Sequence, residues 1–532
     1  MEPGGNTSSR SASSIGHASL PLALILVLGG ILRVVPIWFG LPYTTARPDE
    51  ETSIGHAIAV LGGDPNPHFF HWPSLTFYVL AGLFQMASTL RELAGLPAEL
   101  TDGQRLLIGR GCVALAGTAT IAVLFGIGRL VGGRAVGLTA ALFLAVSMLH
   151  VRESHFAMTD VMMTFFATAA LALLLTGFED GGRRTREWAA AGLAAGLAAS
   201  TKYTAVALLA SLAAAQGLLL IRGRRMTWDV WLPAAAFMAF LVFGFVTATP
   251  FAVLDAPRFV RDFAFNMAHL SEGHVVNLGR GWGYHATRSL PYGLSLPIFL
   301  AALAGAVPFA RRHAAHVLIA GAFALAVYAS VGNGYTVFFR YVLPVVPVLC
   351  LSAAVGVVEL GRLATQRGYA RASTGVLAAV FAAWGAITCA WFDVLLARKD
   401  TRVLAREWLD AHTTRNDTLY EAETPYAMLD LQTLPVHSWR YDPVTASFVN
   451  ADGRTPDWLV LHESPLWTYS AVPAPLRRLA AARYDLVQTI AATRGAARRA
   501  VYDLQDAFFM PVSGFNTVIR PGPTVLIYRR RP

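Results

Sequence analysis

Charged side chains are scarce in this chain, and their scarcity indicates its class. Only 14% of the 532 residues are Asp, Glu, Lys or Arg, whereas 55% are hydrophobic. Soluble globular domains carry about 25% charged residues, which they use to cover their surface. The shortage therefore excludes an ordinary soluble enzyme and indicates a polytopic α-helical membrane protein.

Cysteine is nearly absent, and neither a zinc motif nor a phosphate-binding loop occurs. The three cysteines lie in apolar runs without the spacing of metal ligands, at Cys112, Cys350 and Cys389. We expect them to be small buried hydrophobic residues. The sequence therefore implies no disulfide framework.

Positive charge exceeds negative charge, but it is not gathered on one soluble domain. The formal net charge is +10, and many arginines fall in short gaps between apolar runs. Such gaps are typical of cytoplasmic loops. The basic balance thus indicates orientation and contact with anionic lipid headgroups, and nucleic acid is not an expected partner. The gaps are residues 129–134, 183–186, 222–225, 311–312 and 362–371.

The pattern of apolar runs predicts three parts of the chain. We predict a disordered tail over residues 1–18, a membrane domain over 19–395 and a soluble α/β domain over 396–532. The arginine gaps place the N-terminus in the cytoplasm. Two outer loops, residues 40–72 and 249–290, then lie on the same side as the last domain.

About twelve apolar runs are present, yet ends on opposite sides of a membrane require an odd number of crossings. We therefore expect about 11 to 13 transmembrane helices. Either one run within residues 73–149 is re-entrant or interfacial, or a further crossing is hidden.

The polar parts also carry secondary-structure signals. Residues 256–272 predict an amphipathic helix, which would lie on the membrane surface or form an ordinary loop helix. In the last domain we predict a helix over residues 404–412 and strands over 418–421, 458–462 and 524–528.

The first outer loop carries a group of acids, Arg47-Pro48-Asp49-Glu50-Glu51, just after the first apolar run. Carboxylates beside hydrocarbon are costly, and such a group suits a general base that faces a lipid-borne substrate. The same acids could instead stabilise the positive end of a short helix over residues 50–61.

Four further polar clusters fall at the ends of apolar runs on the predicted outer side. Each has a structural alternative, because Asp160 could cap a helix, Lys202 could extend toward the interface and Arg340 could anchor to lipid. Together they predict a polar pocket at the lipid–water boundary. His68 and His71 could bind a divalent metal, although no further ligand accompanies them. The clusters are residues 68–73, 154–160, 200–204 and 338–344.

In their order and placement these motifs resemble the dolichyl-phosphate-mannose–protein mannosyltransferase-like group, which includes the lipid A aminoarabinose transferases. That group has the GT-C membrane fold. The resemblance covers roughly residues 20–395, and the last domain resembles the group's variable outer domains only loosely. The residues that carry it are Arg47-Pro48-Asp49-Glu50, Gly63-Asp64-Pro65-Asn66-Pro67-His68-Phe69-Phe70, Trp72-Pro73-Ser74-Leu75, Ser154-His155-Phe156-Ala157, Thr159-Asp160, Gly196-Leu197-Ala198, Ser200-Thr201-Lys202-Tyr203-Thr204 and Arg340-Tyr341-Val342-Leu343-Pro344.

The resemblance implies a hexosyl- or pentosyltransferase of the bacterial cytoplasmic membrane, with the last domain in the periplasm. The donor would be a sugar on a polyprenyl phosphate, and the acceptor a hydroxyl of a lipid, glycan or protein, with inversion at the anomeric carbon. No cofactor is required, although some relatives use a divalent metal.

The resemblance also implies roles for particular residues. Asp49 would be the general base, Glu50 would orient it and Asp160 would hold sugar or acceptor hydroxyls. Lys202 and Arg340 would bind the donor phosphate. Further expected positions are Tyr203 and Tyr341 at the phosphate, and His155, His68 and His71 toward the acceptor or its loop.

Two other functions fit part of the pattern. A transporter or flippase would also have many spans and a few charges, but transporters usually place those charges near the midplane of matched halves. A non-catalytic assembly protein could use the last domain to bind a partner. Charges at span ends on one side favour the glycosyltransferase.

Overall fold

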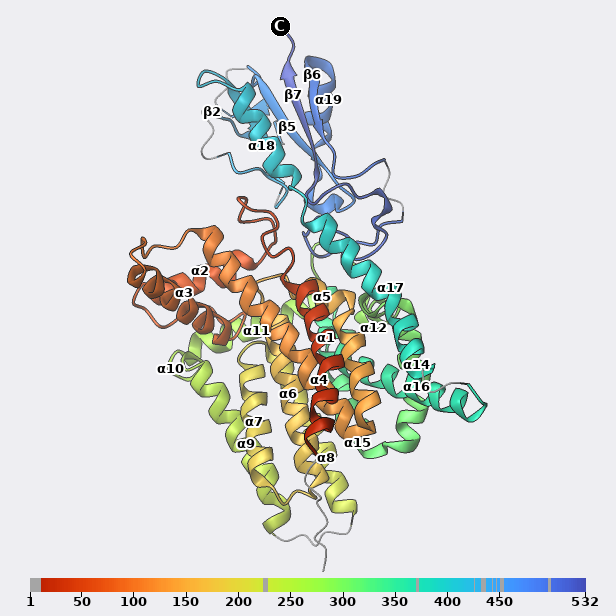
Figure 1. Cartoon of the computed structure of the whole chain (residues 1–532). Helices are drawn as coiled ribbons and strands as arrows, with labels where there is room; N and C mark the ends of the chain where they lie inside the picture. Colours follow the sequence, from red (N-terminus) through yellow and green to blue (C-terminus); the bar gives the residue numbers. More distant parts are fainter. Residues whose placement is uncertain are drawn as a thin grey trace, which may run out of the picture.

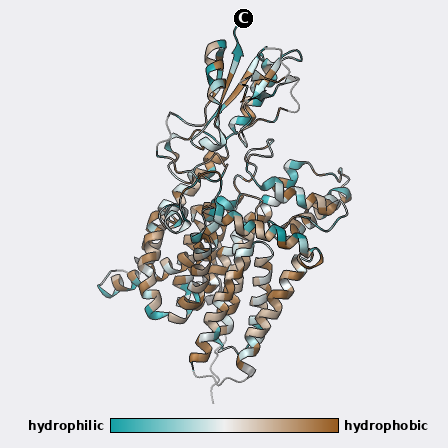
Figure 2. Ribbon diagram, turned by 180° about the vertical axis from the view of Figure 1, so that it is seen from behind, coloured by the Kyte–Doolittle hydropathy of each residue, from teal (hydrophilic) through white to brown (hydrophobic). Residues whose placement is uncertain are grey.

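Figure 1 shows a bundle of long helices with a small α/β domain at one end, where the C-terminus lies. This computed structural model describes residues 11–222, 228–369, 373–424, 426–431, 437–442, 444–445, 447–449, 454–495 and 499–532. Hydrophobic residues dominate the bundle, and hydrophilic residues are more frequent in the α/β domain and around α2 and α3 (Figure 2).

The long helices of the bundle are formed by the apolar runs of the sequence. Among the described residues, seven helices are long and apolar enough to cross a membrane, or up to eight if one sharply bent pair is a single span. The bundle consists of α1 (Ser11–Val34), α4 (Asp102–Ala145), α6 (Thr159–Glu179), α7 (Thr185–Ala199), α8 (Leu208–Ile221), α9 (Trp228–Ala248), α14 (Leu296–Arg312), α15 (Ala314–Asn333), α16 (Val346–Gln366) and α17 (Ser373–Leu396).

The number of candidate spans is lower than predicted for two structural reasons. Two predicted runs are counted together as α4, although Gly132 and Gly133 are not helical and divide it into two helices that fold back on each other, since a Cβ on Gly128 would lie 2.7 Å from Gly137. In addition, the 15 residues of α7 and the apolar stretch Leu20–Val34 of α1 are shorter than a typical span. Helix α1 also begins at Ser11, so the predicted tail is helical from that residue, and residues 1–10 lie outside the described part.

Helices α2 (Glu50–Leu61) and α3 (Leu75–Leu93) form a hairpin beside the bundle at the end that faces the α/β domain (Figure 1). Ile54 and Ala57 of α2 pack against Leu80 and Phe84 of α3. Helix α3 is not among the candidate spans. It is therefore the run within residues 73–149 that fits the predicted interfacial segment.

Short helices connect the bundle to its outer loops. The amphipathic helix predicted over residues 256–272 is confirmed as α11 (Ala256–Glu272). The remaining elements are α5 (Met148–Glu153), η1 (Tyr203–Ala207), α10 (Phe251–Leu254), α12 (Gly281–Tyr284), η2 (His285–Ser289), α13 (Leu290–Leu294) and η3 (Phe339–Val345).

The α/β domain contains a five-stranded mixed sheet in the order β2-β1-β5-β7-β6. Strand β1 pairs in parallel with β2 and β5, whereas β7 is antiparallel to β5 and β6. The predicted helix and three strands are confirmed as α18, β1, β5 and β7. The elements are α18 (Thr401–His412), β1 (Thr418–Glu421), β2 (His437–Ser438), β3 (Tyr441–Asp442), β4 (Ser447–Phe448), β5 (Trp458–Glu463), η4 (Trp467–Tyr469), α19 (Ala474–Arg483), β6 (Tyr484–Ile490), η5 (Phe515–Thr517) and β7 (Thr524–Arg530).

A loop of the α/β domain penetrates the bundle. Phe508 and Met510 belong to the same hydrophobic core as the bundle helices and are almost fully buried. The ring of Phe508 contacts Phe156 and Phe39 edge-on, at centroid distances of 5.0 and 5.9 Å. The α/β domain thus has buried clusters of its own on its sheet, while this loop belongs to the core of the bundle.

This packing predicts that Phe508→Ala destabilises the whole protein. Removing a buried phenylalanine costs roughly 3–5 kcal/mol, and Phe508 is only 3% exposed. We expect a lower melting temperature of the purified full-length protein in detergent. Leu486→Ala, at a side chain 51% exposed on β6, is the control and should change little. Equal melting temperatures for the two variants would contradict the shared core.

Candidate active site

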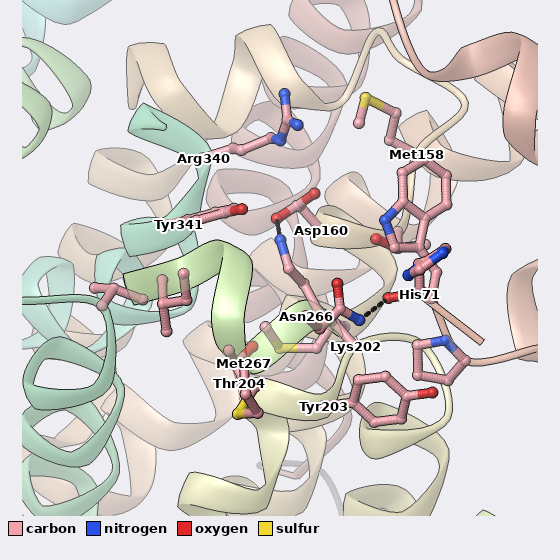
Figure 3. A pocket seen from close by; sticks show the side chains of 16 residues that line it. His71, Met158, Asp160, Lys202, Tyr203, Thr204, Asn266, Met267, Arg340 and Tyr341 are labelled. Atoms are coloured by element: carbon pink, nitrogen blue, oxygen red, sulfur yellow. Dashed lines mark hydrogen bonds and ion pairs between the residues drawn. The ribbon is translucent and has the colours of Figure 1, made fainter. Parts of the chain in front are cut away.

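A small cavity of about 110 Å³ lies at the end of the bundle beside the α/β domain. It is bounded by the end of the first outer loop, the start of α6, the break between α7 and η1, the middle of α11 and the start of η3 (Figure 3). Its polar and aromatic lining includes His71, Asp160, Lys202, Tyr203, Asn266, Arg340 and Tyr341.

Helix ends bring these side chains together. Asp160 lies in the first turn of α6, where the helix dipole favours a carboxylate. Lys202 has extended backbone angles and occupies the break between α7 and η1. Arg340 lies in the first turn of η3. Each of these polar residues lies at the start of a helix or at a break between two helices. Their side chains line the same cavity.

Lys202 and Asp160 form an ion pair inside the cavity (Figure 3). Lys202 Nζ donates to Asp160 Oδ1 at 2.5 Å, and it lies 4.6 Å from the ring centre of Tyr341. Tyr203 points elsewhere, because its hydroxyl donates to the carbonyl of Phe70 at 2.8 Å. Tyr203 thus holds the first outer loop, whereas Tyr341 supports the ammonium group.

Arg340 links the cavity to Asp49. Its Nη2 donates to Asp49 Oδ2 at 3.0 Å. Asp49 precedes α2 with a left-handed φ of 72°, a conformation that aspartate tolerates better than most residues. Its side chain is 31% exposed and does not line the cavity itself. Asp49 therefore reaches the cavity through the guanidinium of Arg340.

Asp506, in the loop that penetrates the bundle, is the centre of a buried ion cluster. Its carboxylate accepts from Arg47 Nη1 at 2.6 Å and from Arg152 Nη2 at 3.1 Å. Arg340 Nη1 lies 3.7 Å from it. Burial alone would raise the pKa of Asp506, but the three guanidinium groups hold it well below its usual range.

Two neighbours of Asp506 fix the backbone that leads to Arg340. Asp503 accepts from the N–H of Phe339 at 2.7 Å. Burial and repulsion by Asp506 raise the pKa of Asp503 to about 7. Gln505 accepts from the N–H of Val337 at 2.6 Å. The α/β domain thus positions the segment that carries Arg340. The sequence offered one signal for this role, two acids beside the apolar stretch 507–510.

Glu50 faces away from the cavity, contrary to its predicted role beside Asp49. Both of its oxygens accept from Arg110, at 2.9 and 2.6 Å, and the N–H of Ala157 donates to Oε1 at 2.8 Å. The residue is fully buried. These bonds attach the start of α2 to α4, so Glu50 has a structural position.

The predicted histidines do not converge. His155 is fully buried, and its ring nitrogens face the carbonyls of Val151 and Val35. His68 is exposed and bonds to Asp64 at 2.8 Å. Only His71 lines the cavity, where its carbonyl accepts from Asn266 (Figure 3).

The histidines also do not fit a divalent metal site. In the part of the chain that the structure describes, no group of three or more His, Cys, Asp or Glu side chains is arranged to hold a metal. The nearest acid to His68 is a partner in a solvent-exposed ion pair. Neither histidine therefore gains the further ligands that the metal hypothesis requires.

Comparisons with known proteins agree with this architecture. Residues 94–247 match the family described as dolichyl-phosphate-mannose-protein mannosyltransferase. The solved structure of ArnT from Cupriavidus metallidurans in the apo state aligns with a TM-score of 0.53 and 17% identity, over 97% of this chain and 98% of that one. No curated protein sequence matches the chain.

The chain has the GT-C fold. ArnT bound to undecaprenyl phosphate aligns with a TM-score of 0.50 and 16% identity, over 97% of this chain and 98% of that one. The Archaeoglobus fulgidus oligosaccharyltransferase in complex with Zn and sulfate aligns with a TM-score of 0.50 and 11% identity, over 96% and 88%. These similarities confirm the predicted fold class and the resemblance to this group of GT-C proteins.

The stability of the folded protein should depend strongly on Asp506. Removing one partner of a buried ion pair costs roughly 3–5 kcal/mol, because the other charge stays buried. We therefore expect Asp506→Asn to lower the melting temperature of the full-length protein substantially. Asp485→Asn, which breaks an exposed pair with Arg531, is the matched control and should cost about 0–1 kcal/mol. Equal effects would show that the cluster contributes no more than a surface pair.

Proposed function

We propose that the protein is a membrane glycosyltransferase that moves a sugar from a polyprenyl phosphate to an acceptor hydroxyl. One observation carries the proposal: Arg340 joins Asp49 to the cavity that contains Lys202. An exposed carboxylate and two cations thus lie together at the outer end of a GT-C bundle. The GT-C fold and the match to the mannosyltransferase family support this chemistry.

Lys202 keeps donors available for a phosphate, and Arg340 adds its positive charge beside it. Lys202 donates one N–H to Asp160, which leaves two for a ligand, whereas Arg340 holds Asp49 through Nη2 and turns its buried Nη1 toward Asp506. Apolar side chains complete the wall, including Met163, Leu270 and Val331. This combination suits a phosphate attached to a lipid chain, and charge-assisted hydrogen bonds would hold it.

In the proposed reaction Asp49 removes the proton of the acceptor hydroxyl as its oxygen attacks the anomeric carbon. The bond between that carbon and the phosphate oxygen breaks, and the configuration inverts. Lys202 and Arg340 stabilise the negative charge that grows on the departing lipid phosphate. Phosphate binding to Arg340 would also release Asp49 from its present partner. Asp160 positions Lys202 and can accept hydrogen bonds from sugar hydroxyls.

The proposed orientation places this site on the outer face of a bacterial cytoplasmic membrane. The α/β domain would then be periplasmic and the N-terminus cytoplasmic, as the arginine-rich gaps indicate. The cavity lies beside the α/β domain, because its lining residue Arg340 and the neighbouring Phe339 contact Asp506 and Asp503 of that domain. That placement favours transfer at one face over transport through the midplane.

Asp49→Asn should abolish most transfer without preventing donor binding. Loss of a general base lowers rates by about 10²–10⁴-fold. Mass spectrometry of the lipids that are extracted with the protein identifies the polyprenyl-linked sugar. The measurement is then the transfer of this sugar by the purified enzyme in nanodiscs. Glu92→Gln, an exposed acid on α3, is the control. Preserved transfer would remove Asp49 from the mechanism, and lipid translocation without transfer would favour a flippase.

Lys202→Ala should weaken the binding of undecaprenyl phosphate by about tenfold or more, because a hydrogen bond to a charged group contributes ~1.5–3 kcal/mol. Arg222→Ala, at the far end of α8, provides the control cation. Arg340→Lys should keep only part of the wild-type affinity for undecaprenyl phosphate, because an ammonium group cannot form the bidentate hydrogen bonds of a guanidinium. Unchanged affinity of Lys202→Ala would show that this lysine serves only its pair with Asp160.

A further inference from the structure

A second hollow, which we call the acidic groove, lies between the first outer loop and the α/β domain. Its volume is about 980 Å³, far larger than the cavity around Lys202. Residues of the loop and of α2 form one wall, and residues that follow β1 form the other. Its lining includes Tyr43, Glu51, Glu421, Glu423, Tyr426 and Trp439.

The charged lining of the acidic groove has one sign. Among the described residues that line it there is no lysine, arginine or histidine. Asp102 is offset by Arg105 at 2.8 Å, outside the lining. Glu421 faces His462 at 3.0 Å. Glu51 and Glu423, for which the described part of the chain shows no ion pair, create a negative field that repels anionic ligands. The acidic lining residues are Glu51, Asp102, Glu421, Glu423 and Asp430.

Glu421 points to a ligand independently of this charge pattern. It is 5% exposed, and its Oε1 accepts from the N–H of Leu429 at 2.6 Å and faces His462 Nε2 at 3.0 Å. Its Oε2 is buried and has no hydrogen-bond partner among the described residues. An unsatisfied buried carboxylate oxygen is costly, and a hydroxyl or amine donated by a ligand would satisfy it.

Aromatic residues give the acidic groove a firm wall close to Asp49. The hydroxyl of Tyr43 donates to the carbonyl of Met428 at 2.7 Å and so ties the loop to the α/β domain. Arg402 packs 4.6 Å from the ring centre of Tyr43 and donates to the carbonyl of Tyr426 at 2.6 Å. Glu51, two residues after Asp49, lines the groove together with Tyr426, so one wall of the groove continues to the segment that carries Asp49.

We propose that the acidic groove binds the acceptor, and that the bound part of this acceptor is a glycan with hydroxyl or amine groups and no phosphate. This assignment rests on the proposed function, in which Asp49 deprotonates the acceptor. Carboxylates accept hydrogen bonds from sugar hydroxyls and pair with ammonium groups, while Tyr43, Tyr426 and Trp439 offer flat apolar faces to the sugar ring. A phosphorylated glycan would instead meet several like charges, which act as a barrier to the wrong substrate.

The test measures glycan binding directly and does not require transfer. Full-length protein in nanodiscs is titrated with three probes by saturation-transfer NMR: diacetylchitobiose, chitobiose and chitobiose phosphate. We expect the two unphosphorylated probes to bind, and the phosphate to bind at least about fivefold more weakly, the effect of one screened charge contact. Equal or tighter binding of the phosphate would overturn the proposal.

Variants locate the binding. Glu51→Gln and Glu423→Gln should weaken binding of chitobiose, and the double variant Glu51→Lys/Glu423→Lys should reverse the preference in favour of the phosphate. Glu463→Gln, at an exposed acid of the same domain, is the matched control. Binding that responds equally to all of these variants, or to none, would overturn the groove assignment.

The outcomes separate the two proposals. If Asp49→Asn loses transfer while the groove variants leave probe binding unchanged, the groove assignment fails and the proposed function stands. If the groove variants change probe binding while Asp49→Asn retains transfer, the proposed role of Asp49 fails and the groove remains a glycan site.

Discussion

The ion cluster around Asp506 is the interaction on which the arrangement of the outer face depends. Charges removed from water are tolerated only when opposite charges and hydrogen bonds compensate them. Asp506 compensates Arg47 and Arg152 and lies beside Arg340, which also contacts Asp49. A carboxylate of the α/β domain therefore helps to set the position of a cation in the cavity. The cavity and the domain form one structural unit.

Local signals in the sequence were sufficient for much of this architecture. Long apolar runs and arginine-rich gaps predicted a polytopic helical protein, and the strand predicted over residues 418–421 coincides with β1. The convergence of Asp160, Lys202 and Arg340 was also predictable, because each lies at the end of an apolar run on one side. The number of spans was less predictable, since α7 and the apolar part of α1 form helices shorter than a typical span.

Other features depend on contacts that no local pattern reveals. Asp506 is 459 residues from Arg47 and 354 from Arg152 in the sequence. No local pattern around either arginine therefore identifies its partner. The role predicted for Glu50, beside Asp49, does not match its position, for a geometric reason. Asp49 has a left-handed backbone just before α2, whereas Glu50 begins the helix and pairs with Arg110 of α4, so the two neighbouring side chains point in different directions. Adjacency in the sequence therefore predicted the wrong partner.

The penetration of Phe508 and Asp506 into the bundle has a consequence for biosynthesis. In chain order this loop follows every helix of the bundle, so the ribosome completes all of them before it makes the carboxylate that lies beside Arg340. The nascent bundle must hold three arginines without that counterion until the last segment has folded back against it. Completion of this end of the bundle is thus the final step of assembly, and it waits for the segment that contains Asp506.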